Sequence, residues 1–140
     1  VTVNGGARSV FGLKTLHLAL GAGDDTLVFK AVNLAAKVTT DGGTGADTLD
    51  YSPLKSGVTV DLAAGEATGT DSERGFDQVF GSAGNDTLTG DGLINLLVGN
   101  RGYGLLVLRR PQDRVCGNVV RGSGLGVISA HGFDPTAPCR

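Results

Sequence analysis

Nine residues, Gly42-Gly43-Thr44-Gly45-Ala46-Asp47-Thr48-Leu49-Asp50, constrain the fold of this chain more than any other segment. They follow the pattern Gly-Gly-x-Gly-x-Asp-x-Φ-x at every defined position, where Φ is a large aliphatic residue. Imperfect copies at residues 20–28 and 81–89 keep Gly at the fourth place, Asp at the sixth and Leu at the eighth. Because glycine adopts positive φ without strain, each copy predicts a tight turn followed by a short strand whose aliphatic residue points inward.

The residue types in these turns suit a hard metal ion. Calcium takes six to eight oxygen ligands from carboxylates, backbone carbonyls and water. A glycine-rich turn can aim successive carbonyls at one point, and aspartate adds a short carboxylate arm. One Gly-x-Asp turn needs no metal, but three copies of the order Gly-x-Asp-Thr-Leu favour one. The candidate metal residues are Asp25, Asp47, Asp86, Gly21, Gly23, Gly42, Gly43, Gly45, Gly81 and Gly84.

Other acidic and amide side chains lie beside the turns. We expect these to be solvated turn residues, with outer ligands as the alternative: Asp24, Asp41, Asp50, Asn85 and Asp91. Residues 63–75 show no strong strand pattern beyond 67–70, and we expect a surface loop there. Its acidic residues Glu66, Asp71 and Glu73 are expected to be solvated.

The nonapeptide resembles the hemolysin-type calcium-binding repeat of RTX proteins. The resemblance covers roughly residues 14–107. It implies a β-roll in which calcium lies between two turns on the same side, and a bacterial protein exported by type I secretion. Asp25 and Asp47 are 22 residues apart and make a plausible pair of turns. Asp86 would need a partner near residue 104, where Gly104 offers no side-chain ligand, so we expect weak occupancy there.

Short β-type runs flank the turns. Lead-in strands begin near residues 14, 36, 57 and 76, a spacing of about twenty residues that is typical of a solenoid. From residue 81 the period tightens to nine. The eighth positions of these blocks are Leu88, Leu97, Leu106 and Val115, whereas the sixth positions are Asp86, Asn95, Gly104 and Asp113. The core position therefore persists longer than the metal position, and the Arg- and Pro-containing turn before Asp113 is assigned no calcium.

The fold class predicted from these patterns is all-β: a right-handed parallel β-roll or β-helix solenoid with short strands and Gly-Asp turns. Strand n would pair with strand n+2, and stacking the rows would bury the apolar side chains that a single row leaves exposed. Glycine supplies 24 of 140 residues and aromatic residues only 5%, which suits a thin aliphatic core better than a conventional one. We expect a calcium-binding solenoid over 1–107 and a degraded repeat, cap or disordered tail over 108–140.

Charged residues and cysteines are unevenly distributed along the chain, with an acidic first part and a basic end that holds both cysteines. Residues 1–98 hold 12 acidic and 6 basic residues, whereas residues 99–140 hold 2 acidic and 6 basic residues. The acidic part suits a cation-binding segment, and the basic end lacks the aromatic residues and motifs of a nucleic-acid site. Cys116 and Cys139 match no zinc or redox spacing, and their pairing as a disulfide or persistence as thiols stays open.

Several function classes find no support in the sequence. There is no HExxH helix, no G-x-S-x-G elbow and no P-loop. His17 lies on the outward face of a predicted strand, and neither it nor His131 suggests catalysis. No apolar run is long enough to span a membrane. The chain begins with Val1 and shows no signal-peptide pattern, so we expect a piece of a longer protein.

The favoured prediction is a non-enzymatic, calcium-binding structural segment of a secreted, extracellular bacterial protein that folds and is stabilised on binding Ca²⁺. We expect calcium ions as partners, with no nucleic acid and no membrane span. One alternative is a cell-surface adhesin or matrix spacer repeat with cell-surface or matrix partners. The other is the C-terminal secretion domain of an extracellular protease or lipase.

Overall fold

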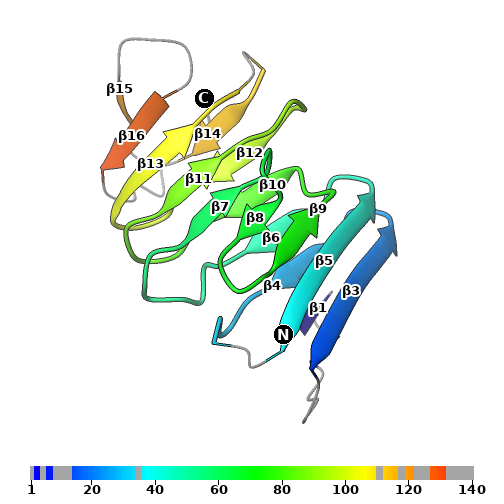
Figure 1. Ribbon diagram of the computed structural model, residues 1–140. Coiled ribbons are helices and arrows are strands. Elements are labelled where there is room, and N and C mark those ends of the chain that lie inside the picture. Colours follow the sequence, from blue (N-terminus) through cyan, green and yellow to red (C-terminus); the bar gives the residue numbers. More distant parts are fainter. Residues whose placement is uncertain are drawn as a thin grey trace.

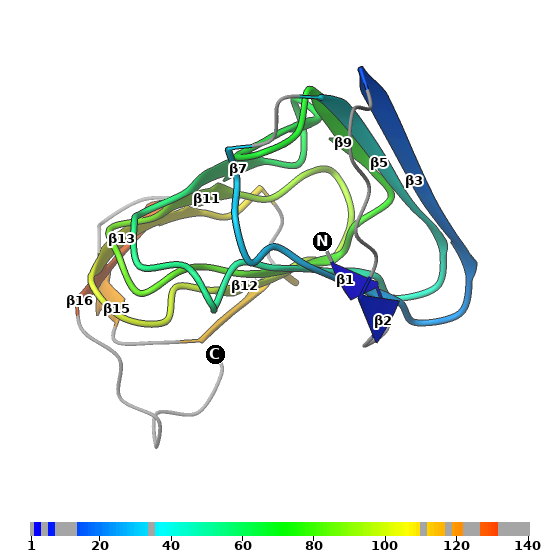
Figure 2. The same cartoon turned by 90° about the horizontal axis from the view of Figure 1, so that it is seen from below.

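The protein is built from short β-strands. The computed structural model describes residues 2–3, 6–7, 14–33, 36–109, 112–116, 119–121 and 127–131 (Figure 1). All regular elements among these residues are strands, which confirms the all-β prediction. They form three sheets, which surround a shared interior in the view of Figure 2.

The largest sheet has seven strands in the order β14-β12-β10-β6-β4-β1-β2. Its strands are β1 (Thr2–Val3), β2 (Gly6–Ala7), β4 (Thr26–Val28), β6 (Thr48–Asp50), β10 (Gln78–Phe80), β12 (Leu96–Val98) and β14 (Arg114–Cys116). The predicted strands that follow the first two motif turns, near residues 26 and 48, are therefore β4 and β6.

A six-stranded sheet has the order β15-β16-β13-β11-β7-β8. Its strands are β7 (Thr59–Asp61), β8 (Glu66–Ala67), β11 (Thr87–Thr89), β13 (Tyr103–Val107), β15 (Val119–Arg121) and β16 (Val127–His131). The third sheet has the order β3-β5-β9, from β3 (Thr15–Ala22), β5 (Lys37–Thr44) and β9 (Ser72–Arg74).

Parallel pairing between strands n and n+2 is confirmed for β3–β5, β4–β6 and the strands from β10 to β14, whereas β5, β6 and β7 pair with β9, β10 and β11. The chain alternates between the seven- and six-stranded sheets from β10 to β14, so β10 pairs with β12, β11 with β13 and β12 with β14, all in parallel. Gln78 lies opposite Leu96, and Leu96 opposite Arg114, which gives a step of two nonapeptides. The parallel row thus includes β14, which lies in the segment 108–140 where a degraded repeat, cap or disordered tail is expected.

Antiparallel pairs make the seven- and six-stranded sheets mixed, whereas the sheet β3-β5-β9 is parallel throughout. The pair β1–β4 is antiparallel at one end, and β13–β16 is antiparallel at the other. Within the six-stranded sheet, β7 and β8 form an antiparallel pair.

The four lead-in strands do not form one stack. β3 and β5 pair in register, Thr15 opposite Lys37, as the spacing of 22 residues predicts. The next predicted strand, at 57–62, instead becomes β7 and pairs with β11. The place beside β5 goes to β9, from the segment predicted to be a loop. That segment contains two strands. β8 pairs with the nearby β7, whereas β9 completes the hydrogen bonding of β5, a partner distant in sequence that local patterns do not show.

The buried aliphatic residues occupy the positions that the nine-residue repeat predicts. The eighth positions Leu88, Leu97 and Leu106 are fully buried, and Val115 is 3% exposed. The alternating run at 57–62 is also confirmed, because its apolar members Val58, Val60 and Leu62 are buried. Leu27, Phe29, Leu49 and Tyr51 join the same core cluster. Burial of one inward aliphatic side chain per strand is what stabilises so thin a core.

The C-terminal predictions fall mostly on residues that the structure does not describe. Cys116 ends β14 and is disulfide-bonded. Cys139 and residues 132–140 lie outside the described residues, as does the side chain of His131.

Candidate metal centre

A row of acid and amide side chains lies along one edge of the seven-stranded sheet. Each member stands one residue before a strand of the sheet, and the strand register places the members side by side. We call this row the acidic column: Asp25, Asp47, Asp77, Asn95 and Asp113. Four of the five are buried. Asp77 and Asp113 were not predicted as site residues, although they share the local signal Asp-x-Val with the motif's Asp-x-Leu.

Hydrogen bonds link neighbours within the acidic column. The backbone N–H of Asp25 donates to Oδ1 of Asp47 at 2.9 Å, and the N–H of Asp47 donates to Oδ2 of Asp77 at 3.1 Å. Further along, the N–H of Asn95 donates to Oδ1 of Asp113 at 3.0 Å. Bonds to a charged acceptor are stronger than neutral ones. The carboxylates of Asp47, Asp77 and Asp113 therefore each tie their own turn to the turn of one neighbouring strand.

Asp86 does not belong to this column. It precedes β11 in the six-stranded sheet, where the register places Val58 on one side and Gly104 on the other. The structure thus brings Asp25 and Asp47 together but separates Asp86 from both. The expected partner position near residue 104 is confirmed, and it carries no side-chain oxygen.

Protein donors already occupy both oxygens of Asp86. Oδ1 accepts from the N–H of Val58 at 2.9 Å and from the hydroxyl of Ser82 at 2.6 Å. Oδ2 accepts from the N–H of Ser82 at 3.0 Å. A cation at this carboxylate would have to compete with three donors, so the Asp86 turn fits calcium poorly.

Asp47 differs from Asp86 in one respect. Its side chain is fully buried, yet Oδ2 has no hydrogen-bond partner. In the later turns, the N–H four residues before the acid or amide donates to the side chain, as from Ser82 to Asp86 and from Arg109 to Asp113. The equivalent amide before Asp47 belongs to Gly43, which lies within β5 and pairs with Gly21 of β3. The complete motif therefore leaves one carboxylate oxygen free.

The first glycine of the motif makes room for the residue at the sixth place. A Cβ on Gly42 would come closer than 3.0 Å to Cβ and Oδ2 of Asp47 and to the carbonyl oxygen of Gly75. Gly81 has the same relation to Asp86, and Gly90 to Asn95. This spacing of five residues explains why glycine opens each of these blocks.

The middle glycines allow the first two turns to stack. Gly43 and Gly45 have φ of 104° and 136°, a region that side chains rarely adopt. A Cβ at either position would also collide with the backbone carbonyl of Gly21 or Gly23 in the turn below. The turns before Asp25 and Asp47 therefore approach each other backbone to backbone, which requires glycine at 43 and 45. At Gly21 and Gly23 a Cβ would meet nothing within 4 Å, and glycine is favoured there by the positive φ of 108° and 113°.

Burial raises the pKa of two carboxylates that precede strands of the two larger sheets. Burial raises the pKa of Asp77, and the charges of Asp47, Asp91 and Asp24 add to that rise, against a hydrogen bond from the Asp47 backbone that lowers it. Burial likewise raises the pKa of Asp86, although its three hydrogen bonds oppose the shift. Both shifts show that the folded protein holds these carboxylates at an electrostatic cost that a cation would offset.

The fit of this site to calcium is partial. Asp47 offers one free, buried carboxylate oxygen beside glycine turns, which is the chemistry that calcium prefers. Within residues 14–33, 36–109 and 112–116, however, no three His, Cys, Asp or Glu side chains converge as a metal-binding group. Backbone carbonyls would have to supply most of the remaining ligands.

The neighbouring acidic and amide residues act as turn caps. Asp24 Oδ1 accepts from the N–H of Ala46, and Asn85 Oδ1 from that of Tyr103, both at 2.9 Å. Asp41 instead pairs with the Arg74 guanidinium at 2.6 Å. The remaining two accept bonds from amides two residues onward, Asp50 from Ser52 and Asp91 from Leu93.

The acidic residues of 63–75 differ from expectation in part. Glu66 and Asp71 are exposed as expected, although Asp71 also accepts a hydrogen bond from the N–H of Val38. Glu73 is buried, which corrects the prediction that it is solvated. Its burial follows from the alternation within β9, which turns the central residue inward.

His17 lies on the exposed side of β3, as predicted, and hydrogen-bonds to the hydroxyl of Thr39. The part of the chain that the structure describes contains no helix long and apolar enough to cross a membrane. Comparison with protein-family models, curated proteins and solved structures finds no match to this chain.

Proposed function

We propose that this chain is a calcium-binding structural segment of a secreted bacterial protein. In this proposal the parallel rows wind as a right-handed β-roll, and calcium stabilises the folded form. The supporting observation is the free Oδ2 of Asp47, a buried carboxylate oxygen that no protein donor satisfies. An unpaired buried charge is costly, and a bound cation offsets that cost.

The turns before Asp25 and Asp47 are the proposed site. Asp47 would supply its free oxygen and Asp25 a second carboxylate from the neighbouring turn. Carbonyl groups of Gly21, Gly23, Gly42, Gly43 and Gly45 would supply further ligands. When bound, the calcium ion contributes positive charge between two turns that already lie in contact.

Asp86 with Gly81 and Gly84 forms a weaker candidate site. Its carboxylate already accepts three hydrogen bonds, and the neighbouring turn offers Gly104 in place of an acid. We expect calcium there to bind more weakly or not at all.

Calcium titration followed by far-UV circular dichroism and calorimetry tests the proposal. We expect β-structure or thermal stability to increase on adding calcium to chelator-treated protein, with heat of binding. Identical spectra and unfolding curves in chelator and in calcium, together with no heat of binding, would contradict the proposal.

A further inference from the structure

Glu73 is a buried carboxylate without a protein partner. It stands at the centre of β9, between exposed Ser72 and Arg74, and is 4% exposed. Neither Oε1 nor Oε2 has a hydrogen-bond partner. Buried polar groups in proteins are nearly always satisfied, so an acid with two unsatisfied oxygens calls for an explanation.

Two further unsatisfied oxygens accompany Glu73. Thr40 of β5 lies directly opposite it in the parallel register, is also 4% exposed, and has an unpartnered Oγ1. Tyr51 is fully buried, stacks on Phe29 with ring centroids 4.9 Å apart, and has an unpartnered hydroxyl. Burial and then the charge of Glu73 raise the pKa of Tyr51.

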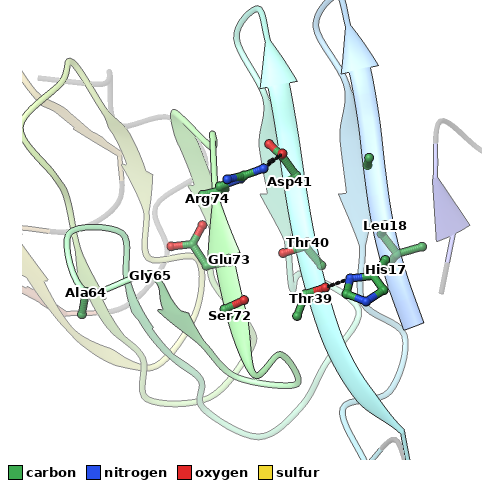
Figure 3. Close-up of a pocket in the computed structure, with 11 residues that line it drawn as sticks. His17, Leu18, Thr39, Thr40, Asp41, Ala64, Gly65, Ser72, Glu73 and Arg74 are labelled. Atoms are coloured by element: carbon green, nitrogen blue, oxygen red, sulfur yellow. Dashed lines mark hydrogen bonds and ion pairs between the residues drawn. The ribbon is translucent and has the colours of Figure 1, made fainter. Parts of the chain in front are cut away.

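No described basic side chain neutralises Glu73. Arg74 forms an ion pair with Asp41 on the exposed face of the sheet, and the Glu73 carboxylate points away from that pair (Figure 3). The nearby charges are negative: burial raises the pKa of Glu73 to about 7, and Asp91 and Asp61 add to the rise. The described surroundings of this carboxylate therefore lack positive charge.

We propose that Glu73 and Thr40 form an internal site for a hard cation that keeps part of its hydration water. Both side chains offer only oxygen, the ligand atom of hard divalent cations. The buried residues Thr40 and Glu73 both line a pocket of about 430 Å³. Exposed His17, Ser72 and Arg74 also line this pocket (Figure 3).

This site is separate from the turn site proposed above. It lies within the interior face of the β5–β9 pair, contains none of the motif residues, and uses a different set of oxygens. Either site can therefore fail a test without deciding the other.

Tyrosine-sensitised Tb³⁺ luminescence provides a direct test, with Tb³⁺ as the calcium mimic and the full chain at mildly alkaline pH. The chain has two tyrosines and no tryptophan, so sensitised emission reports an ion near Tyr51 or Tyr103. We expect emission that excess Ca²⁺ abolishes, that Tyr103→Phe retains and that Tyr51→Phe removes. Glu73→Gln should weaken Tb³⁺ binding by about tenfold or more, because it removes the only charged ligand.

Two controls keep the inference falsifiable. Asp47→Asn removes the free oxygen of the turn site and should leave Tyr51-dependent emission unchanged. Glu73→Gln keeps the side-chain volume and removes a buried charge, so it should remain folded by circular dichroism; if Tyr51→Phe does not fold, the Glu73→Gln titration decides alone. Emission that survives Glu73→Gln with an unchanged midpoint overturns the site. Absence of Tyr51-sensitised emission in the unmodified chain also overturns the site. That result would mean that Glu73 is protonated and binds no cation.

Discussion

The backbone N–H of Asp25 donates a 2.9 Å hydrogen bond to Oδ1 of Asp47, 22 residues further along the chain. The bond joins the two glycine turns that precede β4 and β6, and it uses one oxygen of a fully buried carboxylate. The other oxygen is unpartnered. One aspartate thus combines a structural link between turns with a free ligand atom, and substitutions can separate the two roles.

Asp47→Asn should weaken calcium binding more than it weakens the metal-free fold. The amide keeps an oxygen that can accept the bond from Asp25, but it loses the charge that a cation requires. Asp47→Ala should weaken calcium binding more than Asp86→Ala does. Isothermal calorimetry measures the affinities, and equal losses for the two alanine variants would contradict the different environments of the two carboxylates.

Asp86→Ala should chiefly destabilise the metal-free protein. It leaves the buried amides of Val58 and Ser82 without their acceptor, which costs about 1–3 kcal/mol for each unsatisfied group. Urea unfolding in chelator measures the loss. A stability equal to that of the unmodified protein would show that the Asp86 hydrogen bonds contribute little.

Gly42→Ala should destabilise the protein by about 1–3 kcal/mol or more, because the added Cβ overlaps Asp47 and the carbonyl of Gly75. Gly92→Ala is a matched control. A Cβ at Gly92 would have no neighbour within 4 Å, and neither glycine has a positive φ. Thermal unfolding of both variants distinguishes steric exclusion from a general effect of removing glycine, and equal losses would refute the steric explanation.

Leu97→Ala should lower the free energy of unfolding by about 2–5 kcal/mol, since this side chain is fully buried at the eighth position of its block. Leu93→Ala, in the same block, should change it by less than about 0.5 kcal/mol because Leu93 is 59% exposed. Chemical denaturation of the pair checks the phase of the nine-residue repeat, and a larger loss for Leu93→Ala would show that the phase is wrong.

Stability without metal should fall as pH rises. The folded protein raises the pKa of Glu73 from 4.5 to about 7, mainly through burial and then through the charges of Asp91 and Asp61. Between these values the folded state keeps a proton that the unfolded state has lost, so each increase in pH favours unfolding. The contribution is fully present below about pH 4.5, is lost through pH 7, and is on the order of 3 kcal/mol.

Urea unfolding in chelator across this pH range measures the slope. Glu73→Gln should make it shallower, whereas Glu66→Gln, at an exposed glutamate, should leave it unchanged. A slope that is the same in Glu73→Gln and in the unmodified protein would exclude Glu73 as its source.

Local patterns predicted much of the fold. The aliphatic phase at Leu88, Leu97 and Leu106 follows from one inward residue per short strand, and the step of two nonapeptides follows from alternation between two sheets. The pairing of Asp25 with Asp47 was also predictable, because equal spacing of turn and strand keeps both in register. The signal Asp-x-Val before a strand could have identified Asp77 and Asp113 as further members of the acidic column.

The sequence by itself determined the turns, the inward positions and the residue types that suit a hard cation, since these depend on contacts within a few residues. Only the tertiary structure decided which turns share an edge. The segment 51–75 separates the early rows from the later ones, so β6 pairs with β10 at a distance of 30 residues and β9 takes the place beside β5. That arrangement puts Asp86 on a different sheet from Asp47 and buries Glu73, because strand partners and burial depend on long-range packing that no local period encodes.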